Sequence, residues 1–137
     1  MAKGSSGIPQ KHETSAGIRE GLKKATTEML VLFLLRQQSM YTYEMMQEIA
    51  KLSQGVLTFN TMYLAIYRAE KSGYIVESGK VLSNDNRTRV YFTITEMGQQ
   101  HLAELVQEYH RVIHSIDDIL RQDGSLFQED SYNGAKK

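Results

Sequence analysis

Residues 58–95 constrain the fold more than any other part of the chain, because a helical pattern runs directly into two strand patterns. Between Thr58 and Gly73, apolar residues recur at the spacing of one helix face, and those predicted to face the core are Met62, Ala65, Ile66 and Ala69. Asn60 or Thr58 is the expected N-cap, since either side chain can accept hydrogen bonds from the free amides of a first turn. Gly73 is the expected end, because glycine readily adopts a left-handed conformation.

The opposite face of this helix is predicted to be exposed, and it mixes polar, aromatic and basic side chains: Asn60, Leu64, Tyr67, Arg68 and Lys71. A helix with a small apolar back and a mixed front suits insertion into a DNA groove, where side chains read base edges. Residues 58–73 are therefore a candidate recognition helix.

The residues after Gly73 predict a hairpin with strands at 74–83 and 89–95. In the second strand, apolar and polar residues alternate as in a half-buried strand: Val90, Phe92 and Ile94 against Arg89, Tyr91 and Thr93. The turn between the strands, 84–88, is polar and carries Arg87, which with Arg89 makes a cationic tip. Helix, hairpin and basic tip together predict a winged helix, mainly α with a small β-hairpin wing.

Two further helices are predicted before this unit. The first runs from about residue 18 to 37, and its run Met29–Leu35 is apolar on all sides, which predicts a buried central helix. The second spans about 43–52 with Thr42 as its cap, and its core stripe consists of Met45, Met46, Ile49 and Leu52. The order helix, turn, helix and wing places the second helix of the pair in the major groove of DNA.

Tyr41 and Tyr43 stand at the start of the second helix, where free amides and the helix dipole favour an anion. Their hydroxyl groups are candidates to donate hydrogen bonds to a DNA phosphate. Alternatively, one or both rings pack as half-buried aromatic side chains with a solvated tip.

A long helix is predicted from Thr95, its expected N-cap, to about residue 122. Its apolar residues follow steps of three and four along a heptad seam: Leu102, Leu105, Tyr109, Val112, Ile116 and Ile119. A second line recurs at every seventh position: Val106, Ile113 and Leu120. A seam of this length predicts a homodimer, in which the helix packs against its twin or against the first helix of the neighbour; the alternative is packing within one chain.

The chain therefore divides into four predicted parts: 1–17, a flexible N-terminal arm or expression scar; 18–95, the winged helix-turn-helix domain; 96–122, the dimerisation helix; and 123–137, a flexible tail. Residues 1–94 hold 12 Lys and Arg against 8 Asp and Glu, whereas residues 95–137 hold 4 against 8. A basic front and an acidic back fit a DNA-facing module with a separate assembly element.

Five segments in order resemble the PadR family of winged helix-turn-helix transcriptional regulators: Met40–Glu44, Thr61–Tyr63, Arg68–Glu70, Gly73–Ile75 and Arg89–Gly98. The resemblance covers about residues 22 to 120. It implies a dimeric bacterial or archaeal repressor whose C-terminal helix supplies the dimer contact. It also implies binding to a palindromic operator in double-stranded DNA and, in several branches, release by a small aromatic or drug-like effector.

Position and resemblance together nominate the DNA-binding residues: Tyr41, Tyr43, Asn60, Thr61, Tyr63, Leu64, Tyr67, Arg68, Lys71, Arg87 and Arg89. We expect Arg68 or Asn60 to read base edges, Lys71 to hold phosphate, and the wing arginines to reach phosphate or the minor groove. The family usually has Pro where Leu64 stands; this outward leucine is expected either to touch a thymine methyl group or to pack on the wing.

Tyr109 occupies the position where some drug-binding relatives of the PadR family carry a flat aromatic residue. In a dimer, the two Tyr109 rings on either side of the two-fold axis are candidates to bind a planar ligand between them. The alternative is that Tyr109 fills the seam. His110 and His114 lie one turn apart, but two imidazoles without a third ligand make an open site at best, and no metal is predicted.

Other classes of protein fit the sequence less well. There is no nucleophile–base set, phosphate-cradling glycine loop or paired-carboxylate motif, so neither an enzyme nor a cofactor is predicted. The absence of cysteine fits a reducing cytoplasm, and no apolar run approaches the length of a membrane span. The remaining rival to a homodimeric DNA-binding regulator is a winged-helix protein–protein adaptor without DNA affinity.

Overall fold

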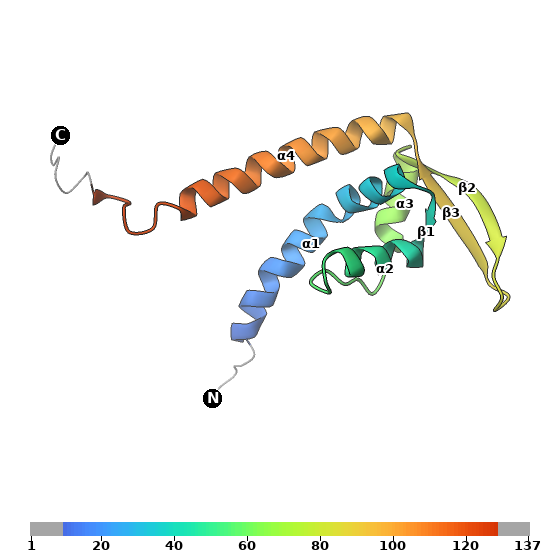
Figure 1. The fold of residues 1–137 in the computed structure, drawn as a ribbon, viewed down its shortest axis with the longest axis horizontal. Coiled ribbons are helices and arrows are strands. Elements are labelled where there is room, and N and C mark those ends of the chain that lie inside the picture. Colours follow the sequence, from blue (N-terminus) through green and yellow to red (C-terminus); the bar gives the residue numbers. More distant parts are fainter. Residues whose placement is uncertain (1–9, 129–137) are drawn as a thin grey trace. The chain divides into compact units, whose positions relative to one another are not determined.

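The computed structural model describes residues 10–128, which form four helices and one three-stranded sheet (Figure 1). The elements are α1 (Gln10–Gln37), β1 (Met40–Tyr41), α2 (Thr42–Leu52), α3 (Tyr63–Lys71), β2 (Ile75–Leu82), β3 (Thr88–Ile94) and α4 (Glu96–Leu120). The chain divides into two compact units, residues up to Leu102 and residues from Ala103 onward. The predicted fold class, a mainly helical winged helix with a small sheet, is confirmed.

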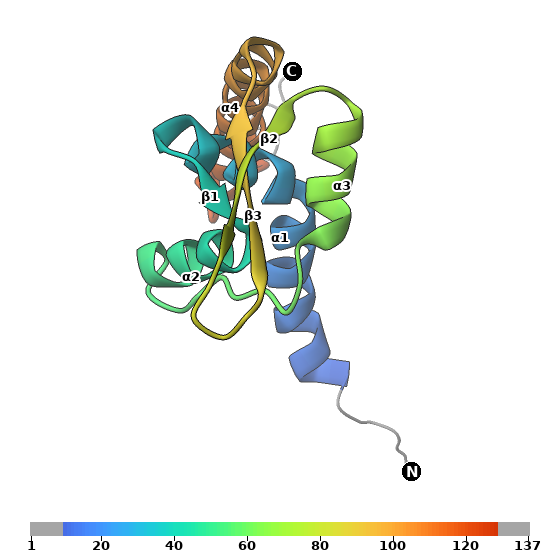
Figure 2. The same ribbon diagram turned by 90° about the vertical axis from the view of Figure 1, so that its right-hand side faces the viewer.

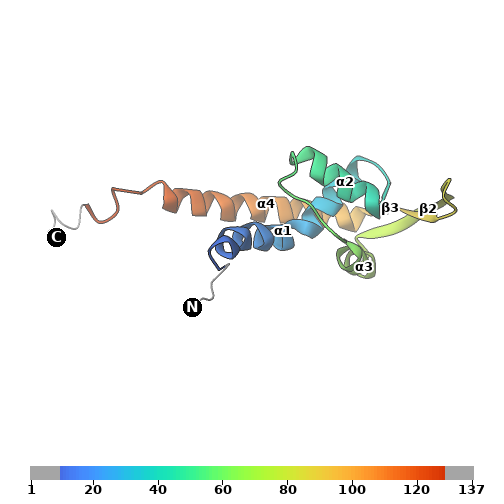
Figure 3. The ribbon, with the colours of Figure 1, turned by 90° about the horizontal axis from the view of Figure 1, so that it is seen from below.

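The C-terminal half of α1 is the centre of the first unit, with α2 on one side and α3 on the other (Figures 2 and 3). Val31, Leu32, Leu34 and Leu35 are buried there, as expected from the apolar run. Phe33 is 40% exposed, which fits a run that is buried on most but not all of its sides. The helix also begins at Gln10, eight residues before the predicted start at Ile18, so residues 10–17 belong to α1 and not to a flexible arm; residues 1–9 lie outside the described part.

The start of α2 differs from the prediction by one residue. Thr42 is the first helical residue, and Tyr41 is the N-cap. The Tyr41 backbone N–H donates to Glu44 Oε1 at 3.4 Å. The Glu44 carboxylate, in the first turn, thus provides a hydrogen-bond acceptor for the amide of the N-cap residue. Met45 and Ile49 are buried, but Leu52, predicted to belong to the core stripe, is 60% exposed because it ends the helix.

The sheet has the strand order β1–β3–β2, with both pairs antiparallel. The two-residue strand β1 was not predicted; it places Met40 opposite Phe92 on the central strand, and both side chains are buried. Arg89 is half-buried where simple alternation predicts exposure, and its guanidinium carbon lies 4.7 Å from the centroid of the Tyr41 ring. A bulge between Glu77 and Gly79 interrupts β2.

A compact joint connects α3, the sheet and α4. Gly73 has φ +82°, and the Tyr74 amide donates to the Ala69 carbonyl at 2.9 Å, which closes α3 with the predicted glycine. Thr95 is confirmed as the cap of α4, since the Gly98 amide donates to Thr95 Oγ1 at 3.0 Å. The same hydroxyl donates to the Gly73 carbonyl at 2.7 Å, so the end of α3 and the start of α4 share one side chain.

The first two turns of α4 pack on their own chain. Gly98 and Leu102 are buried, and the His101 ring stacks on Tyr74 with centroids 4.1 Å apart. His101 Nε2 also lies 3.2 Å from Glu28 Oε1 on α1. Leu102 is 1% exposed, so its assignment to the subunit interface is wrong: it belongs to the core of its own chain.

The second unit comprises the rest of α4 and a series of turns. The helix ends at Leu120, close to the predicted end at residue 122, and residues 121–127 form turns, with a positive φ at Gly124. The remainder of the predicted tail, residues 129–137, lies outside the described part. None of the described helices is both long and apolar enough to cross a membrane.

Gly98 provides a test of the joint. A Cβ added there would overlap the Tyr74 carbonyl oxygen and lie 2.8 Å from Ile94 Cγ1, so the backbone would have to shift. Alanine normally stabilises a helix interior by up to about 1 kcal/mol relative to glycine, but overpacking costs about 1–3 kcal/mol. We therefore expect Gly98→Ala to lower the free energy of unfolding, measured by urea denaturation, by about 2 kcal/mol.

The matched control is Gly21→Ala in α1, where an added Cβ meets nothing within 4 Å. This variant should be as stable as the parent or slightly more so, because only the helix propensity changes. A Gly98→Ala protein at least as stable as the parent would show that the close approach at the joint does not constrain the fold.

Candidate nucleic-acid interface

The exposed face of α3 is the face that the helical spacing predicts. Met62, Ile66 and Ala69 are buried and Ala65 is half-buried, so all four predicted core residues point inward. The residues predicted to face outward are exposed: Leu64 by 60%, Tyr67 by 57%, and also Asn60, Arg68 and Lys71. Leu64 is thus too exposed to be packed on the wing.

Two neighbours on this face interact with each other. Lys71 Nζ lies 5.5 Å from the centroid of the Tyr67 ring and donates to its hydroxyl at 3.4 Å. The Tyr67 ring therefore holds the ammonium group of Lys71 at the surface of the helix. Tyr63, one turn before Tyr67, is 72% exposed. A base or phosphate approaching α3 would meet aromatic, apolar and cationic groups side by side.

The start of α3 lies later in the chain than predicted. The helix begins at Tyr63 and its N-cap is Met62, so neither Thr58 nor Asn60 caps it. Thr61 Oγ1 accepts from the Tyr63 amide at 3.3 Å. Asn60 and Thr61 are exposed in the connection just before the helix.

The starts of α2 and α3 and the wing line one open groove of about 510 Å³. Five of the predicted DNA-binding residues meet there: Tyr41, Tyr43, Tyr63, Arg87 and Arg89. The other predicted contacts on α3 do not line this groove. Four further residues that line it were not predicted to bind DNA: Thr42, Glu77, Asp85 and Thr88. The nearest sequence signals are the position of Thr42 at the start of a helix and those of Asp85 and Thr88 in the polar hairpin turn; Glu77 lies within a strand and had no such signal.

Tyr41 and Tyr43 differ in their surroundings. The Tyr41 ring meets Tyr91 edge-on with centroids 5.3 Å apart, and the Arg89 guanidinium carbon lies 4.7 Å from the Tyr41 centroid. Tyr41 is half-buried, which matches the packing alternative, whereas Tyr43 is 57% exposed. A cation held over an aromatic face keeps its charge available while its orientation is fixed.

The tip of the wing is closed by its own side chains. The Ser83 amide donates to the Arg87 carbonyl at 2.8 Å, and Asn86 takes the positive φ, +68°, that the tight turn requires. The Ser83 hydroxyl donates to the Asp85 carboxylate, which also accepts from the Arg87 amide at 3.3 Å. The hydrogen bond from the Ser83 hydroxyl has the largest effect on the Asp85 carboxyl group and lowers its pKa below the ordinary value. The Arg87 amide and the Arg87 charge lower this pKa further.

Arg87 remains available at this tip. Its Nε lies 3.8 Å from Asp85 Oδ2, yet its side chain is 83% exposed, so the pair is a surface contact of small energy. A phosphate oxygen would bind the guanidinium group in place of the carboxylate or beside it. Glu77 and Asp85 line the same groove and carry negative charge. They would repel a phosphate group, so a nucleic-acid backbone in the groove would lie nearer the arginines than these carboxylates.

The apolar seam of α4 is exposed beyond Leu102. Along it Tyr109 is 36%, Val112 41%, Ile116 45% and Ile119 64% exposed, and Leu120 on the second line is 66% exposed. The remaining predicted interface residues are half-buried: Leu105, Val106 and Ile113. Contiguous exposed apolar side chains along one helix face are typical of a surface that binds another protein, a membrane or a ligand.

The two histidines on α4 do not acquire metal ligands. The His110 and His114 rings stack with centroids 5.9 Å apart, and Tyr109 meets His110 edge-on at 5.3 Å. Among residues 10–128, no three His, Cys, Asp or Glu side chains are grouped closely enough to hold a metal ion.

Comparisons with known proteins match this architecture. Residues 31–104 match the model of the transcriptional regulator PadR-like family. A protein of Lysinibacillus sphaericus named "Uncharacterized protein X" is 28% identical over 102 residues, which cover 73% of this chain and 93% of that protein.

Solved structures share the fold. A PadR family transcriptional regulator from Eggerthella lenta has a TM-score of 0.70 at 22% identity, covering 82% of this chain and 97% of that chain. A PadR-like transcriptional regulator from Bacillus cereus has a TM-score of 0.60 at 24% identity, covering 73% and 96%. A transcriptional regulator from Clostridium thermocellum has a TM-score of 0.63 at 23% identity, covering 72% and 96%.

Proposed function

The chain belongs to the PadR-like family of transcriptional regulators, and we propose that it binds DNA sequence-specifically as a homodimeric repressor released by a small-molecule effector. The observation that supports DNA binding most strongly is that the starts of α2 and α3 and the basic wing line one groove, and that α3 carries a further exposed face with Arg68 and Lys71 in the same unit. A protein–protein adaptor would not require cationic side chains at both the wing tip and the exposed helix face.

In this proposal α3 enters the major groove. Arg68 offers a bidentate donor pair to a guanine edge, and Asn60 offers both a donor and an acceptor to adenine. Leu64, with 60% of its surface exposed, contacts a thymine methyl group. Lys71, held against Tyr67, binds a phosphate, while Thr61 and Tyr63 contact the backbone or bases at the start of the helix.

The groove beside α3 receives the phosphate backbone. The hydroxyl group of Tyr43 and the free amides of the first turn of α2 donate to one phosphate. Arg89, stacked on Tyr41, and Arg87 at the tip neutralise the next part of the strand or enter the minor groove. Neutralisation of phosphates supplies most of the affinity, whereas α3 supplies the choice of sequence.

Dimerisation buries the seam of α4. Val112, Ile116 and Ile119 on the first line and Leu120 on the second are exposed in a single chain, and a heptad seam is covered most simply by another helix. Two recognition helices related by a two-fold axis would read half-sites about one turn of DNA apart, which requires a palindromic operator. The dimer represses by occupying that operator.

Tyr109 lies on the same seam and is 36% exposed. Two such rings, one from each subunit, would sandwich a planar aromatic effector. Effector binding between the dimer helices would change the separation or angle of the two recognition helices, and the operator would be released.

Phosphate contacts are tested by salt dependence. Lys71→Ala and Arg87→Ala should each weaken binding to operator and to unrelated duplex alike, because phosphate contacts carry no sequence information. Each substitution should also reduce the slope of log affinity against log salt by about one for every phosphate that the variant no longer neutralises. Arg121→Ala, which removes an exposed positive charge after the end of α4, is the matched control and should change neither. An unchanged slope for both interface variants would refute this footprint.

The seam is tested by a charge at its centre. Ile116→Asp should yield monomers in analytical ultracentrifugation and lower operator affinity at least about a hundredfold, because only one half-site can then be held. The side chain is 45% exposed in the single chain, so the fold itself should persist. Gln107→Asp adds the same charge on the opposite, exposed face of α4 and should remain dimeric. A parent protein that is monomeric in dilute solution would contradict the proposal before any variant is made.

A further inference from the structure

The connection between α2 and α3 sets the position of the recognition helix, yet little regular structure holds it. Residues 53–62 contain turns and bends but no helix or strand, and the N-cap of α3 makes no side-chain hydrogen bond. The first half is fixed locally, since Ser53 Oγ accepts from the Leu57 amide at 2.9 Å and Gly55 adopts a φ of +83°. In the second half, local hydrogen bonds reach only its end, where Thr61 Oγ1 accepts from the Tyr63 amide and the Met62 carbonyl accepts from the Ile66 amide. Among the described hydrogen bonds, none of the local ones holds Thr58, Phe59 or Asn60.

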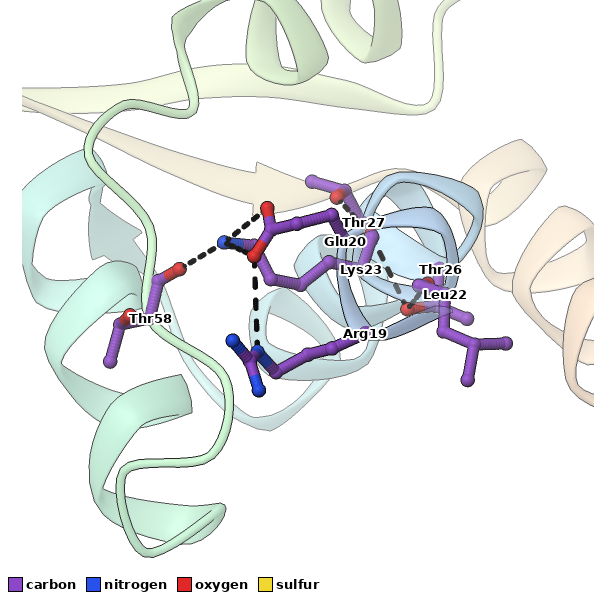
Figure 4. A network of polar contacts seen from close by, with 7 residues as sticks. All are labelled: Arg19, Glu20, Leu22, Lys23, Thr26, Thr27 and Thr58. Atoms are coloured by element: carbon purple, nitrogen blue, oxygen red, sulfur yellow. Dashed lines mark hydrogen bonds and ion pairs between the residues drawn. The ribbon is translucent and has the colours of Figure 1, made fainter. Parts of the chain in front are cut away.

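Lys23 on α1 provides the support for this second half. Its ammonium nitrogen donates to the Thr58 carbonyl at 2.5 Å, across 35 residues of sequence. The same nitrogen lies 4.9 Å from the centroid of the Phe59 ring. Figure 4 shows the lysine reaching from the helix to the connection, with Thr58 on the far side of the contact. One side chain thus binds two consecutive residues that lead into α3.

The acidic partner of Lys23 lies one turn earlier on the same helix. Lys23 Nζ is 3.2 Å from Glu20 Oε1, and Arg19 Nε is 3.9 Å from Glu20 Oε2 (Figure 4). The Lys23 side chain is only 16% exposed, whereas that of Glu20 is 59% exposed. Hydrogen bonds to a charged group are stronger than those between neutral groups, and shielding from water increases the difference.

We propose that Lys23 is a positioning residue for DNA binding: it fixes Thr58 and Phe59 against α1 and thereby sets where α3 begins and how its outward face is presented. The DNA-binding half of this proposal rests on the function proposed above; the structural half does not. A lysine in a DNA-binding domain is otherwise expected to neutralise phosphate. Lys23 is unsuited to that role, because its ammonium group already has a carbonyl, a carboxylate and a ring as partners and is mostly shielded.

Lys23→Met retains the aliphatic stem and removes the donors, and Lys24→Met removes the same charge from the adjacent, exposed position. Amide hydrogen exchange in the DNA-free protein is the first readout, with the amides of Leu57, Tyr63 and Ile66 as reporters because each is hydrogen-bonded in or next to the connection. We expect exchange at Tyr63 and Ile66 to accelerate about tenfold or more in Lys23→Met, and to remain unchanged in Lys24→Met. Equal exchange in both variants would overturn the proposal.

Operator binding at two salt concentrations is the second readout. Lys23→Met should lower the affinity for operator about tenfold while its salt slope stays that of the parent, since every phosphate is still neutralised as in the parent. A slope reduced by about one, with normal exchange, would instead make Lys23 a phosphate-binding residue and refute the positioning role. If the parent protein binds no DNA, the proposed function fails, and the exchange measurement alone decides whether Lys23 holds the connection.

Glu20→Ala keeps the experiment decisive if Lys23→Met does not fold. Glu20 is exposed, so its removal should leave the fold intact while Lys23 is deprived of the carboxylate that orients it. The same amides should exchange faster, by a smaller factor than in Lys23→Met. Unchanged exchange in Glu20→Ala, with Lys23→Met unfolded, would count against a specific role of the cluster in positioning α3.

Discussion

The close approach of α4 to the Tyr74 carbonyl is the constraint on which the rest of the structure depends. Only a glycine at position 98 lets the first turn of α4 lie directly on that backbone, because an added Cβ would overlap the carbonyl oxygen. The Thr95 amide donates to this carbonyl at 3.0 Å, and the Thr95 hydroxyl donates to the carbonyl of Gly73. Thr95 therefore joins three parts of the chain by hydrogen bonds: the residues that end α3, the end of the wing and the first turn of α4.

In the proposed regulator, this joint would connect the helix that carries the dimer seam with the helix that reads DNA. The Thr95 side chain binds both the residue that closes α3 and the first turn of α4, so a rotation at the start of α4 would be passed to the end of α3. At its other end α3 is held through Thr58 and Phe59 by Lys23 of α1. Helix α3 is thus supported at both ends by side chains that do not lie on its exposed face. If α3 reads DNA as proposed, such supports would let the angle of the reading surface change while the residues on it stay the same.

Local chemistry explains which features were predictable from the sequence. The face of α3 follows from helical spacing, and Gly73 and Thr95 follow from the needs of helix ends, so each is decided by residues within a few positions. The missed features depend on partners far along the chain. Strand β1 exists because Met40 meets Phe92, and Lys23 acquires its role only when Thr58 is brought to it. Leu102 also fits the heptad pattern, but its side chain is buried in the core of its own chain. The groove needed the wing and two helix starts together, which no local pattern describes.

The central claim is that the outward face of α3 and the wing tip together form a DNA-binding surface. Backbone amide chemical shifts, recorded while a duplex from the protein's own upstream region is added at moderate salt, test it most directly. The account predicts that the largest changes fall on Asn60–Lys71 and on residues 83–89, with smaller changes at the start of α2. Shifts that are absent, or that fall mainly outside these segments, would contradict the account and leave the protein–protein adaptor as the better description.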